Sequence, residues 1–400
     1  MKPKTYRLAT LGCRTNQYES QGYAAQLRRL GYEAAGEGEP ADVCVVNTCT
    51  VTEGADASSR HEIRKLLKEN PCAQVFVTGC MADKVQGNER LKVVLNADKE
   101  RLIEQVMPGL ESYPEFQIEA FEGRTRAFVK VQDGCNSFCT YCIIPYVRGR
   151  SRSRGIEDVV REVEGLVAAG YGEVVLTGIN IGDFEAGLAH LVRAVDRVPG
   201  LKRLRVSSID PDEVNDDLLA AILEGKTTCP SMHIVLQSGS NVILKRMNRT
   251  YTIQIFTETI ERLKAAHPDF TFTTDVIVGF PGETEGDHRD TLRAIEQVQF
   301  AKVHMFPYSP RERTRAALYP NRVPSEVIHR RKQEVMRLSE QVAFQLRERF
   351  VGRRMPVLME EGNRGHTANF LPVLVEAPPR QMVTVELIEN TPEGLRGRIV

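Results

Sequence analysis

Apolar and polar residues alternate in blocks along the first 120 residues of the chain. Apolar, β-prone runs at 6–13, 41–49 and 74–80 are separated by amphipathic stretches at 18–30 and 57–69. Strands that alternate with helices form parallel sheets, and continuously apolar strands are buried on both faces. The pattern therefore predicts an N-terminal α/β domain, residues 1–120, built on a parallel sheet.

A longer block of the same kind follows, and we expect it to form a second domain, residues 121–350. Its apolar runs lie at 127–134, 173–180, 201–209, 232–239, 272–280 and 300–308. Amphipathic helices are expected between them at 156–169, 188–198, 215–223, 253–266 and 288–298, with one long helix at 325–350. Six such units predict a partial TIM-type (β/α)6 barrel, whose chemistry belongs at the carboxyl ends of its strands.

The last fifty residues change character. Short apolar runs at 355–359, 367–376, 382–388 and 395–400 are separated by turn residues. They predict a small closed, OB-like β-barrel, residues 351–400. Barrels of this size often bind oligonucleotides, and a purely stabilising module is the alternative.

Three cysteines that are far apart in the sequence each end a predicted strand: Cys13, Cys49 and Cys80. Because the carboxyl ends of parallel strands share one edge of a sheet, we expect these thiols to converge. The polar start of the chain and the absence of long apolar runs favour a cytoplasmic protein without a membrane span. In that compartment clustered cysteines indicate metal binding or catalysis. Cys44 and Cys72 receive no role.

The first strand of the predicted barrel ends in DGCNSFCTYC, which contains Cys135, Cys139 and Cys142. A structural zinc ion takes four protein ligands, whereas three thiolates on a 4Fe–4S cluster leave one iron open for reaction. The spacing therefore favours an iron–sulfur cluster. Zinc with a remote fourth ligand, such as Cys229 or a histidine, is the alternative, although the eight histidines show no metal-ligand spacing.

This cysteine motif, followed in order by TGIN (177–180), RVSSID (205–210) and VIVGFPGE (276–283), resembles the radical S-adenosylmethionine enzymes. The resemblance implies that Cys135, Cys139 and Cys142 hold a 4Fe–4S cluster whose open iron binds S-adenosylmethionine. It also implies cofactor contacts from residues near the strand ends, namely Phe138, Tyr141, Thr177, Gly178, Asn180, Ser207, Asp210 and Gly279. Gln237 and Asp275 are expected to touch cofactor or substrate, or to be satisfied polar groups of the barrel.

Three N-terminal segments, LGCRTNQYES (11–20), VNTCTVT (46–52) and VTGCMA (77–82), resemble the cysteine segments of the methylthiotransferases, and the C-terminal strands resemble their RNA-binding TRAM domain. Within that family, the first two segments are most similar to the branch that acts on N6-threonylcarbamoyladenosine beside the tRNA anticodon. The alternatives are the branches acting on isopentenyladenosine in tRNA and on an aspartate of ribosomal protein S12.

The family resemblance implies a radical reaction that adds sulfur and a methyl group at C2 of the adenine. Cys13, Cys49 and Cys80 would hold an auxiliary 4Fe–4S cluster that carries the sulfur, and S-adenosylmethionine would serve as both radical source and methyl donor. The implied partners are the tRNA anticodon loop, a flavodoxin- or ferredoxin-like electron donor and a sulfur source. We expect a monomer.

Charge supports RNA binding only locally, because 53 Lys and Arg residues balance 53 Asp and Glu residues. Arg148, Arg150, Arg152 and Arg154 form an alternating run, and residues 311–354, with Arg311 and Arg313, are strongly basic. Such stretches can neutralise phosphates, or they can be solvated helix faces. Arg313 also replaces a glycine that is usual in the family. A non-catalytic, zinc-bearing RNA-binding protein is the rival hypothesis from another class.

Overall fold

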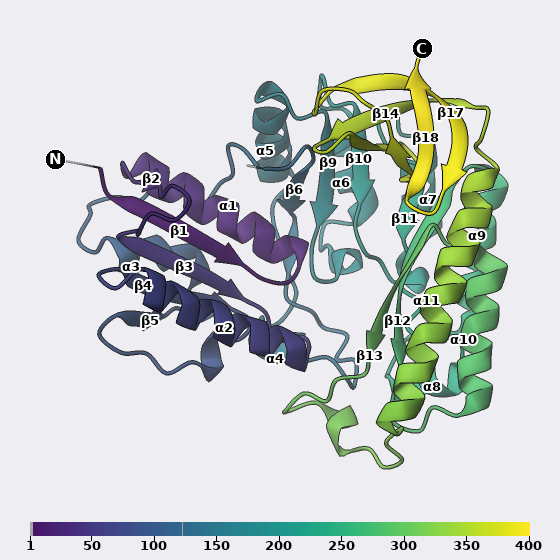
Figure 1. Cartoon of the computed structure of the whole chain (residues 1–400), viewed down its shortest axis with the longest axis horizontal. Helices are drawn as coiled ribbons and strands as arrows, with labels where there is room; N and C mark the ends of the chain where they lie inside the picture. Colours follow the sequence, from purple (N-terminus) through teal and green to yellow (C-terminus); the bar gives the residue numbers. More distant parts are fainter. Residues whose placement is uncertain (1–2, 122) are drawn as a thin grey trace.

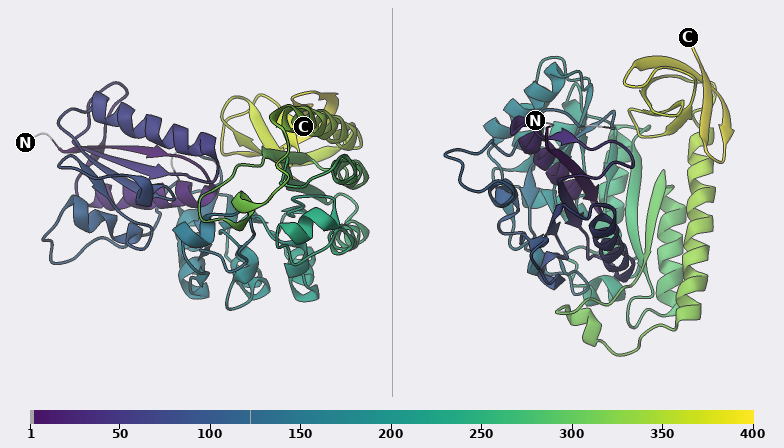
Figure 2. Two further views of the ribbon diagram at one scale, coloured as in Figure 1. Left: turned by 90° about the horizontal axis from the view of Figure 1, so that it is seen from below. Right: turned by 60° about the vertical axis from the view of Figure 1, so that its left-hand side comes forward.

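The computed structural model describes residues 3–121 and 123–400, which form three parts joined side by side (Figure 1). The N-terminal part is an α/β layer, the central part is a curved row of strands backed by helices, and the C-terminal part is a small β-barrel at one end of a long helix (Figure 2). Within the described ranges, no helix combines the length and the hydropathy that a membrane span requires.

The N-terminal sheet is fully parallel and has the strand order β2-β1-β3-β4-β5. Its strands are β1 (Thr5–Thr10), β2 (Glu33–Ala34), β3 (Val43–Thr48), β4 (Gln74–Gly79) and β5 (Leu91–Val93). Its helices are α1 (Arg14–Arg29), α2 (Glu53–Glu69) and α3 (Leu102–Val106), with short 3-10 turns at Ala82–Lys84 and Lys99–Arg101. The predicted parallel sheet is confirmed.

Both faces of this sheet are covered, as its continuously apolar strands predict. Val43 and Val45 of β3 pack in the core shared with α1 and α3, whereas Cys44 and Val46 pack in the core shared with α2. Successive side chains of a strand point to opposite faces, so one strand serves both cores. Cys44 is therefore a buried apolar residue, as expected.

The central part contains six parallel strands in sequential order. They are β6 (Ala127–Lys130), β9 (Glu173–Thr177), β10 (Arg203–Val206), β11 (Ser231–His233), β12 (Thr271–Val278) and β13 (Lys302–Pro307). The sheet β6-β9-β10 is joined to β11-β12-β13 by isolated parallel bridges, including Ile209 with Ile234. The short strands β7 (Gln132–Asp133) and β8 (Arg152–Ser153) pair antiparallel beside β6. This arrangement confirms the partial barrel.

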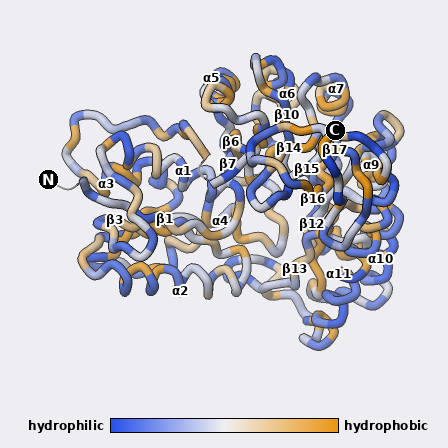
Figure 3. The backbone as a smooth tube through the Cα atoms, turned by 45° about the horizontal axis from the view of Figure 1, so that its top comes forward, coloured by the Kyte–Doolittle hydropathy of each residue, from blue (hydrophilic) through white to orange (hydrophobic). Residues whose placement is uncertain are grey.

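Amphipathic helices cover the outer face of the barrel. They are α5 (Ile156–Ala168), α6 (Leu188–Asp196), α7 (Asp216–Glu224), α9 (Ile253–Ala266), α10 (Glu285–Val298) and α11 (Ser325–Glu348), with short helices α4 (Ile144–Val147) and α8 (Asn241–Arg246). Further 3-10 turns lie at Ile181–Asp183, Pro211–Glu213 and Arg315–Leu318. Hydrophilic and hydrophobic residues lie side by side on these helices (Figure 3), as on helices that pack one face against a sheet.

The C-terminal strands close into a barrel in the order β14-β15-β16-β18-β17. They are β14 (Arg354–Glu360), β15 (Arg364–Thr367), β16 (Pro372–Leu374), β17 (Met382–Thr391) and β18 (Gly394–Ile399). The expected strand at 367–376 is instead the end of β15 and the separate strand β16. Arg203 and Arg205 of β10 donate hydrogen bonds to carbonyl groups of this barrel, which therefore sits at the amino ends of the central strands.

Candidate functional site

Cys135, Cys139 and Cys142 lie in the loop after β7, beyond the carboxyl end of the first barrel strand. Gly134 begins this loop with φ +71°, and a Cβ atom there would lie 2.0 Å from the carbonyl oxygen of Arg150. The position therefore accepts only glycine. Arg249, which follows α8, donates from Nη1 to Cys139 Sγ at 2.9 Å. The loop is thus fixed at both its start and its middle.

Gln132 links the cysteine loop to the end of β9, where Thr177 is the last strand residue. Its Oε1 accepts hydrogen bonds from the backbone N–H groups of Ile179 (2.9 Å) and Asn180 (3.0 Å), and its Nε2 donates to the Gly134 carbonyl at 2.7 Å. Gly178 packs against the Gln132 side chain. Sequence reasoning did not single out Gln132, because a lone strand glutamine carries no motif.

The ends of β9 and β10 present polar groups toward the same edge. Asn180 donates from Nδ2 to Glu213 Oε1 at 3.1 Å, and Asp210 forms an ion pair with Arg249. Burial and the neighbouring Asp210 raise the pKa of Glu213 to about 7. Ser207 Oγ is buried and has no hydrogen-bond partner among the described residues. The expected cofactor residues at these two strand ends are therefore brought together.

A cavity of about 200 Å³ separates the cysteine loop from the N-terminal part. The barrel contributes Tyr141, Cys142, Gln237, Asp275, Ile277 and Phe306 to its lining, and the loop after β3 contributes Val51 and Thr52. Gln237 has φ +59°, and its Oε1 is buried without a hydrogen-bond partner among the described residues. This unpartnered group is available to a polar ligand in the cavity, whereas Asp275 Oδ2 lies 3.4 Å from His233 Nε2.

Phe138 and Gly279 lie outside the lining of this cavity. The Phe138 ring lies 5.9 Å from that of Tyr146, and the Arg150 guanidinium is 4.5 Å from its centroid. Gly279 has φ +77°, and a Cβ atom there would lie 2.4 Å from Ile328 of α11. Its backbone is thus constrained by a turn and by close packing, which already accounts for glycine at this position.

The three N-terminal cysteines converge as predicted. Cys49 and Cys80 directly follow β3 and β4, and Cys13 is the N-cap of α1. A Cβ atom on Gly12 would lie 2.9 Å from Cys49 Sγ. Burial, opposed by Arg148 and aided by the Cys13 and Cys49 thiols, raises the pKa of the Cys80 thiol to about 11. The helix α1 begins four residues earlier than expected, which places Cys13 at its start rather than at the end of a longer strand.

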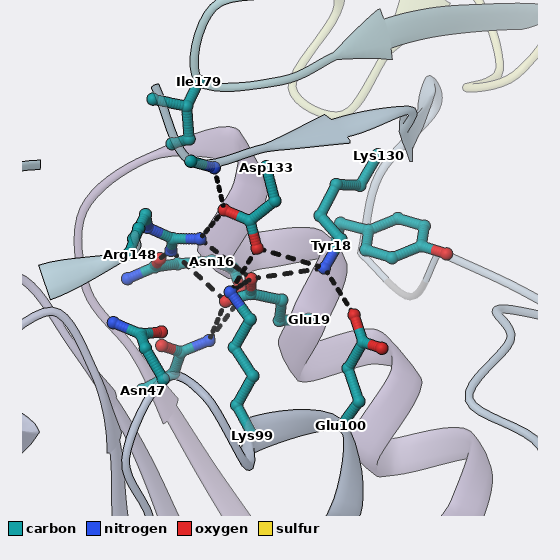
Figure 4. A network of polar contacts seen from close by, with 12 residues as sticks. Asn16, Tyr18, Glu19, Asn47, Lys99, Glu100, Lys130, Asp133, Arg148 and Ile179 are labelled. Atoms are coloured by element: carbon teal, nitrogen blue, oxygen red, sulfur yellow. Dashed lines mark hydrogen bonds and ion pairs between the residues drawn. The ribbon is translucent and has the colours of Figure 1, made fainter. Parts of the chain in front are cut away.

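Arg148 connects this cysteine site to the barrel. Its side chain is fully buried, and its Nε donates to Cys80 Sγ at 3.2 Å. Its Nη1 lies 3.0 Å from Glu19 Oε1 of α1 and 2.9 Å from Asp133 Oδ1 of β7, and its Nη2 donates to Asn16. Figure 4 shows the side chains of Arg148, Glu19 and Asp133 pointing toward one another from separate elements. Arg148 is therefore not available to an RNA phosphate, which corrects the expectation from its basic run.

Two lysines complete the buried network in Figure 4. Lys99 Nζ lies 2.8 Å from Glu19 Oε1 and pairs with Asp133, whereas Lys130 Nζ lies 3.5 Å from Glu19 and 3.1 Å from the more exposed Glu100. The positive charges outweigh the effect of burial and hold the pKa of Glu19 at about 2. The network thus joins the two cysteine-bearing parts through paired charges.

Two other expected RNA contacts are also engaged within the protein. Arg154 Nη1 lies 2.5 Å from Glu162 Oε2, and Arg311 Nη1 lies 2.7 Å from Asp56 Oδ2 of α2. Arg311 is buried, and it joins the barrel to the N-terminal part. Internal pairing of this kind leaves little of the guanidinium for a phosphate.

Arg150, Arg152 and Arg313 remain exposed. Arg313 has φ +69°, a region in which glycine is favoured, and its guanidinium lies 5.1 Å from the centroid of the Tyr146 ring. Its Nη1 is 3.9 Å from Asp83 Oδ2. The Arg313 side chain therefore reaches from the central barrel to Asp83 of the N-terminal part.

Cys135, Cys139 and Cys142 offer only thiols as donors, and thiolates are the protein ligands of 4Fe–4S clusters. Within residues 3–121 and 123–400, no three His, Cys, Asp or Glu side chains are grouped so that they could hold one metal ion. Zinc needs its donors around one point, whereas each thiolate of a 4Fe–4S cluster binds a separate iron. Cys229 is buried beside Arg205 and Glu173 near the amino ends of the strands, away from the cysteine loop. It therefore does not supply a fourth ligand.

Two family models match separate parts of the chain. Residues 129–295 match the Radical SAM superfamily, and residues 5–98 match "Uncharacterized protein family UPF0004". A Chlamydia pneumoniae protein named threonylcarbamoyladenosine tRNA methylthiotransferase MtaB is 47% identical over 99% of this chain and 98% of its own length. A Bacillus subtilis protein of the same name is 37% identical over 92% of this chain and 90% of its own length.

Proteins with another stated substrate are also similar. An Acidothermus cellulolyticus protein named tRNA-2-methylthio-N(6)-dimethylallyladenosine synthase is 37% identical over 98% of this chain and 84% of its own length. Among solved structures, the radical S-adenosylmethionine methyltransferase TsrM from Kitasatospora setae aligns with a TM-score of 0.54. It is 14% identical and covers 76% of this chain and 73% of its own, so this likeness concerns the fold alone.

Proposed function

The chain belongs to the radical S-adenosylmethionine methylthiotransferases, enzymes that transfer a methylthio group to tRNA, and we propose that its substrate is N6-threonylcarbamoyladenosine beside the anticodon. The observation that carries this proposal is the 47% identity, over nearly the whole of both chains, to a relative named for that substrate. The relatives named for dimethylallyladenosine are 33–37% identical to this chain.

We further propose that the enzyme holds two 4Fe–4S clusters, one on Cys135, Cys139 and Cys142 and one on Cys13, Cys49 and Cys80. When bound, the clusters and S-adenosylmethionine supply the radical chemistry that an unactivated C–H bond requires. The support is the placement of two three-thiol sites on neighbouring strand edges, with the cavity beside Cys142 also reaching Val51 and Thr52. A base in that cavity would lie between the two sites.

The chain's own residues would position the reactants. Gln132 holds the cysteine loop and the β9 end in one arrangement, and Arg249 donates a hydrogen bond to Cys139. Gln237 and Asp275 offer polar atoms to the base edge, and the apolar lining excludes water from the reacting atoms. The adenosine must leave its stack to enter, as single-stranded RNA bases do when proteins bind them.

Mass spectrometry of tRNA nucleosides tests the substrate. Cells that lack the gene should lose the 2-methylthio form of threonylcarbamoyladenosine and accumulate the unmethylthiolated nucleoside. Loss of the methylthio form of isopentenyladenosine instead would contradict the proposal.

The iron content of the protein tests the proposed number of clusters. Anaerobically reconstituted protein should be brown and hold about eight irons per chain, and replacement of all three cysteines of either site should remove about four. A colourless, folded protein that holds zinc would support the non-catalytic rival.

A further inference from the structure

A second cavity, of about 240 Å³, lies inside the barrel between α1, the inner faces of the strands and Phe370 of the C-terminal barrel. Its lining is rich in arginine, with Arg14, Arg124, Arg126 and Arg205. None of its other lining residues is an aspartate or a glutamate. The cavity is therefore suited to an anion.

Arg14 is exposed and differs from Arg126 and Arg205 in having no ion-pair partner in the described part of the chain. Arg126 Nη2 lies 2.6 Å from Glu360 Oε1, and Arg205 Nε lies 2.6 Å from Glu173 Oε1. Among the described residues, Arg14 forms no side-chain hydrogen bond and no ion pair, and its guanidinium lies 5.6 Å from the centroid of the Phe128 ring in β6. Gln17, one turn further along α1, lines the same cavity with a buried Oε1 that has no hydrogen-bond partner.

The cavity adjoins the proposed reaction site in two ways. Arg14 directly follows Cys13, so the turn that presents a cysteine of the auxiliary site also presents this guanidinium. On β12, Thr273 lines the arginine-rich cavity, whereas Asp275 and Ile277 line the cavity beside Cys142. Alternate residues of a strand share a face and advance by about 6.6 Å, so the two cavities lie one after the other along the same face of β12.

We propose that Arg14 binds the carboxylate of the threonylcarbamoyl group and so selects this substrate over adenosines with an apolar N6 substituent. The inference rests on the proposed function. Burying a carboxylate without a partner is strongly unfavourable, and a guanidinium can pair with it through two parallel hydrogen bonds. A dimethylallyl group in the same place would offer the Arg14 guanidinium no acceptor and would gain no ion pair, which favours the substrate that carries a carboxylate.

The test uses reconstituted enzyme and anticodon stem-loop RNAs that carry threonylcarbamoyladenosine, its methyl ester or isopentenyladenosine. Fluorescence anisotropy gives each Kd, and mass spectrometry gives each methylthio product. Wild type should bind the acid roughly ten- to hundredfold more tightly than the ester. Arg14→Gln should abolish that difference while leaving iron content and affinity for the ester unchanged, and Arg14→Lys should restore part of it. Arg161→Gln, which changes an exposed arginine of α5, should behave as wild type.

The outcomes separate the possible errors. If Arg14→Gln weakens binding of acid and ester equally, the arginine binds a backbone phosphate, and the inference is overturned. If the variant keeps the preference for the acid, the inference is also overturned, although the proposed function stands. If wild type modifies only the isopentenyladenosine RNA, the proposed function fails and the inference fails with it.

Discussion

Glu19 is the residue on which the buried charge network depends most. Three cations, Arg148, Lys99 and Lys130, surround two buried carboxylates, Glu19 and Asp133. Replacing one of the cations with a neutral residue leaves two positive and two negative side chains, which balance. Loss of Glu19 leaves three buried cations facing one buried carboxylate, which is the costlier imbalance.

The magnitude for Glu19→Gln follows from the pKa of the carboxyl group. Because that pKa falls from 4.5 to about 2 on folding, the ionised group contributes about 3 kcal/mol, in line with about 3–5 kcal/mol for breaking a buried ion pair. A depressed pKa contributes stability that is complete above pH 4.5 and is lost as the pH falls toward 2. The deficit of the variant should therefore be constant between pH 6 and pH 8, within about 1 kcal/mol.

Urea unfolding of the purified protein, followed by tyrosine fluorescence, measures this deficit. Lys99→Met should cost less than Glu19→Gln, and Glu62→Gln, which changes a surface pair of 3.8 Å, should cost less than about 1 kcal/mol. If Glu19→Gln costs no more than Glu62→Gln, or less than Lys99→Met, the charge-balance argument is wrong.

Three further predictions concern other parts of the chain. Arg205→Met removes a donor to the carbonyl of Thr367, which helps hold the C-terminal barrel to the central part. Limited proteolysis should therefore cut the junction to this barrel faster in the variant than in the wild type. Gly134→Ala places a Cβ atom 2.0 Å from the Arg150 carbonyl oxygen and should distort the cysteine loop, lowering the iron content by about four per chain. A normal iron content would show that the loop tolerates a side chain at this position. Glu213 has a pKa raised to about 7, so its ionisation destabilises the fold as the pH rises from 4.5 through 7. Glu213→Gln should therefore raise the Tm relative to wild type at pH 8 but not at pH 5.

The fold could be predicted because its elements depend on local patterns. Apolar runs marked the central strands, and Cys49 and Cys80, each directly after a strand, could be placed at the sheet edge, whereas Cys13 caps α1. The edge strands Glu33–Ala34 and Leu91–Val93 were missed because they are too short to show periodicity. The long helix at Ser325–Glu348 ended two residues before its predicted limit.

The arginines show where sequence patterns are insufficient. Arg148 and Arg150 look equivalent in an alternating run, yet the first is buried against Cys80 and the second is exposed. What distinguishes them is the position of Glu19, which is 129 residues away in the sequence from Arg148. Gln132 was missed for the same reason, since its partners at Ile179 and Asn180 are brought to it only by the fold.

One measurement tests the central claim that two cysteine sites act together on tRNA. Reconstituted enzyme is incubated with S-adenosylmethionine, reductant and tRNA that carries threonylcarbamoyladenosine, and both 5′-deoxyadenosine and the 2-methylthio nucleoside are quantified. Cys139→Ala should abolish both products, whereas Cys49→Ala should retain 5′-deoxyadenosine formation and lose the methylthio nucleoside. Normal methylthio product from either variant would contradict the account.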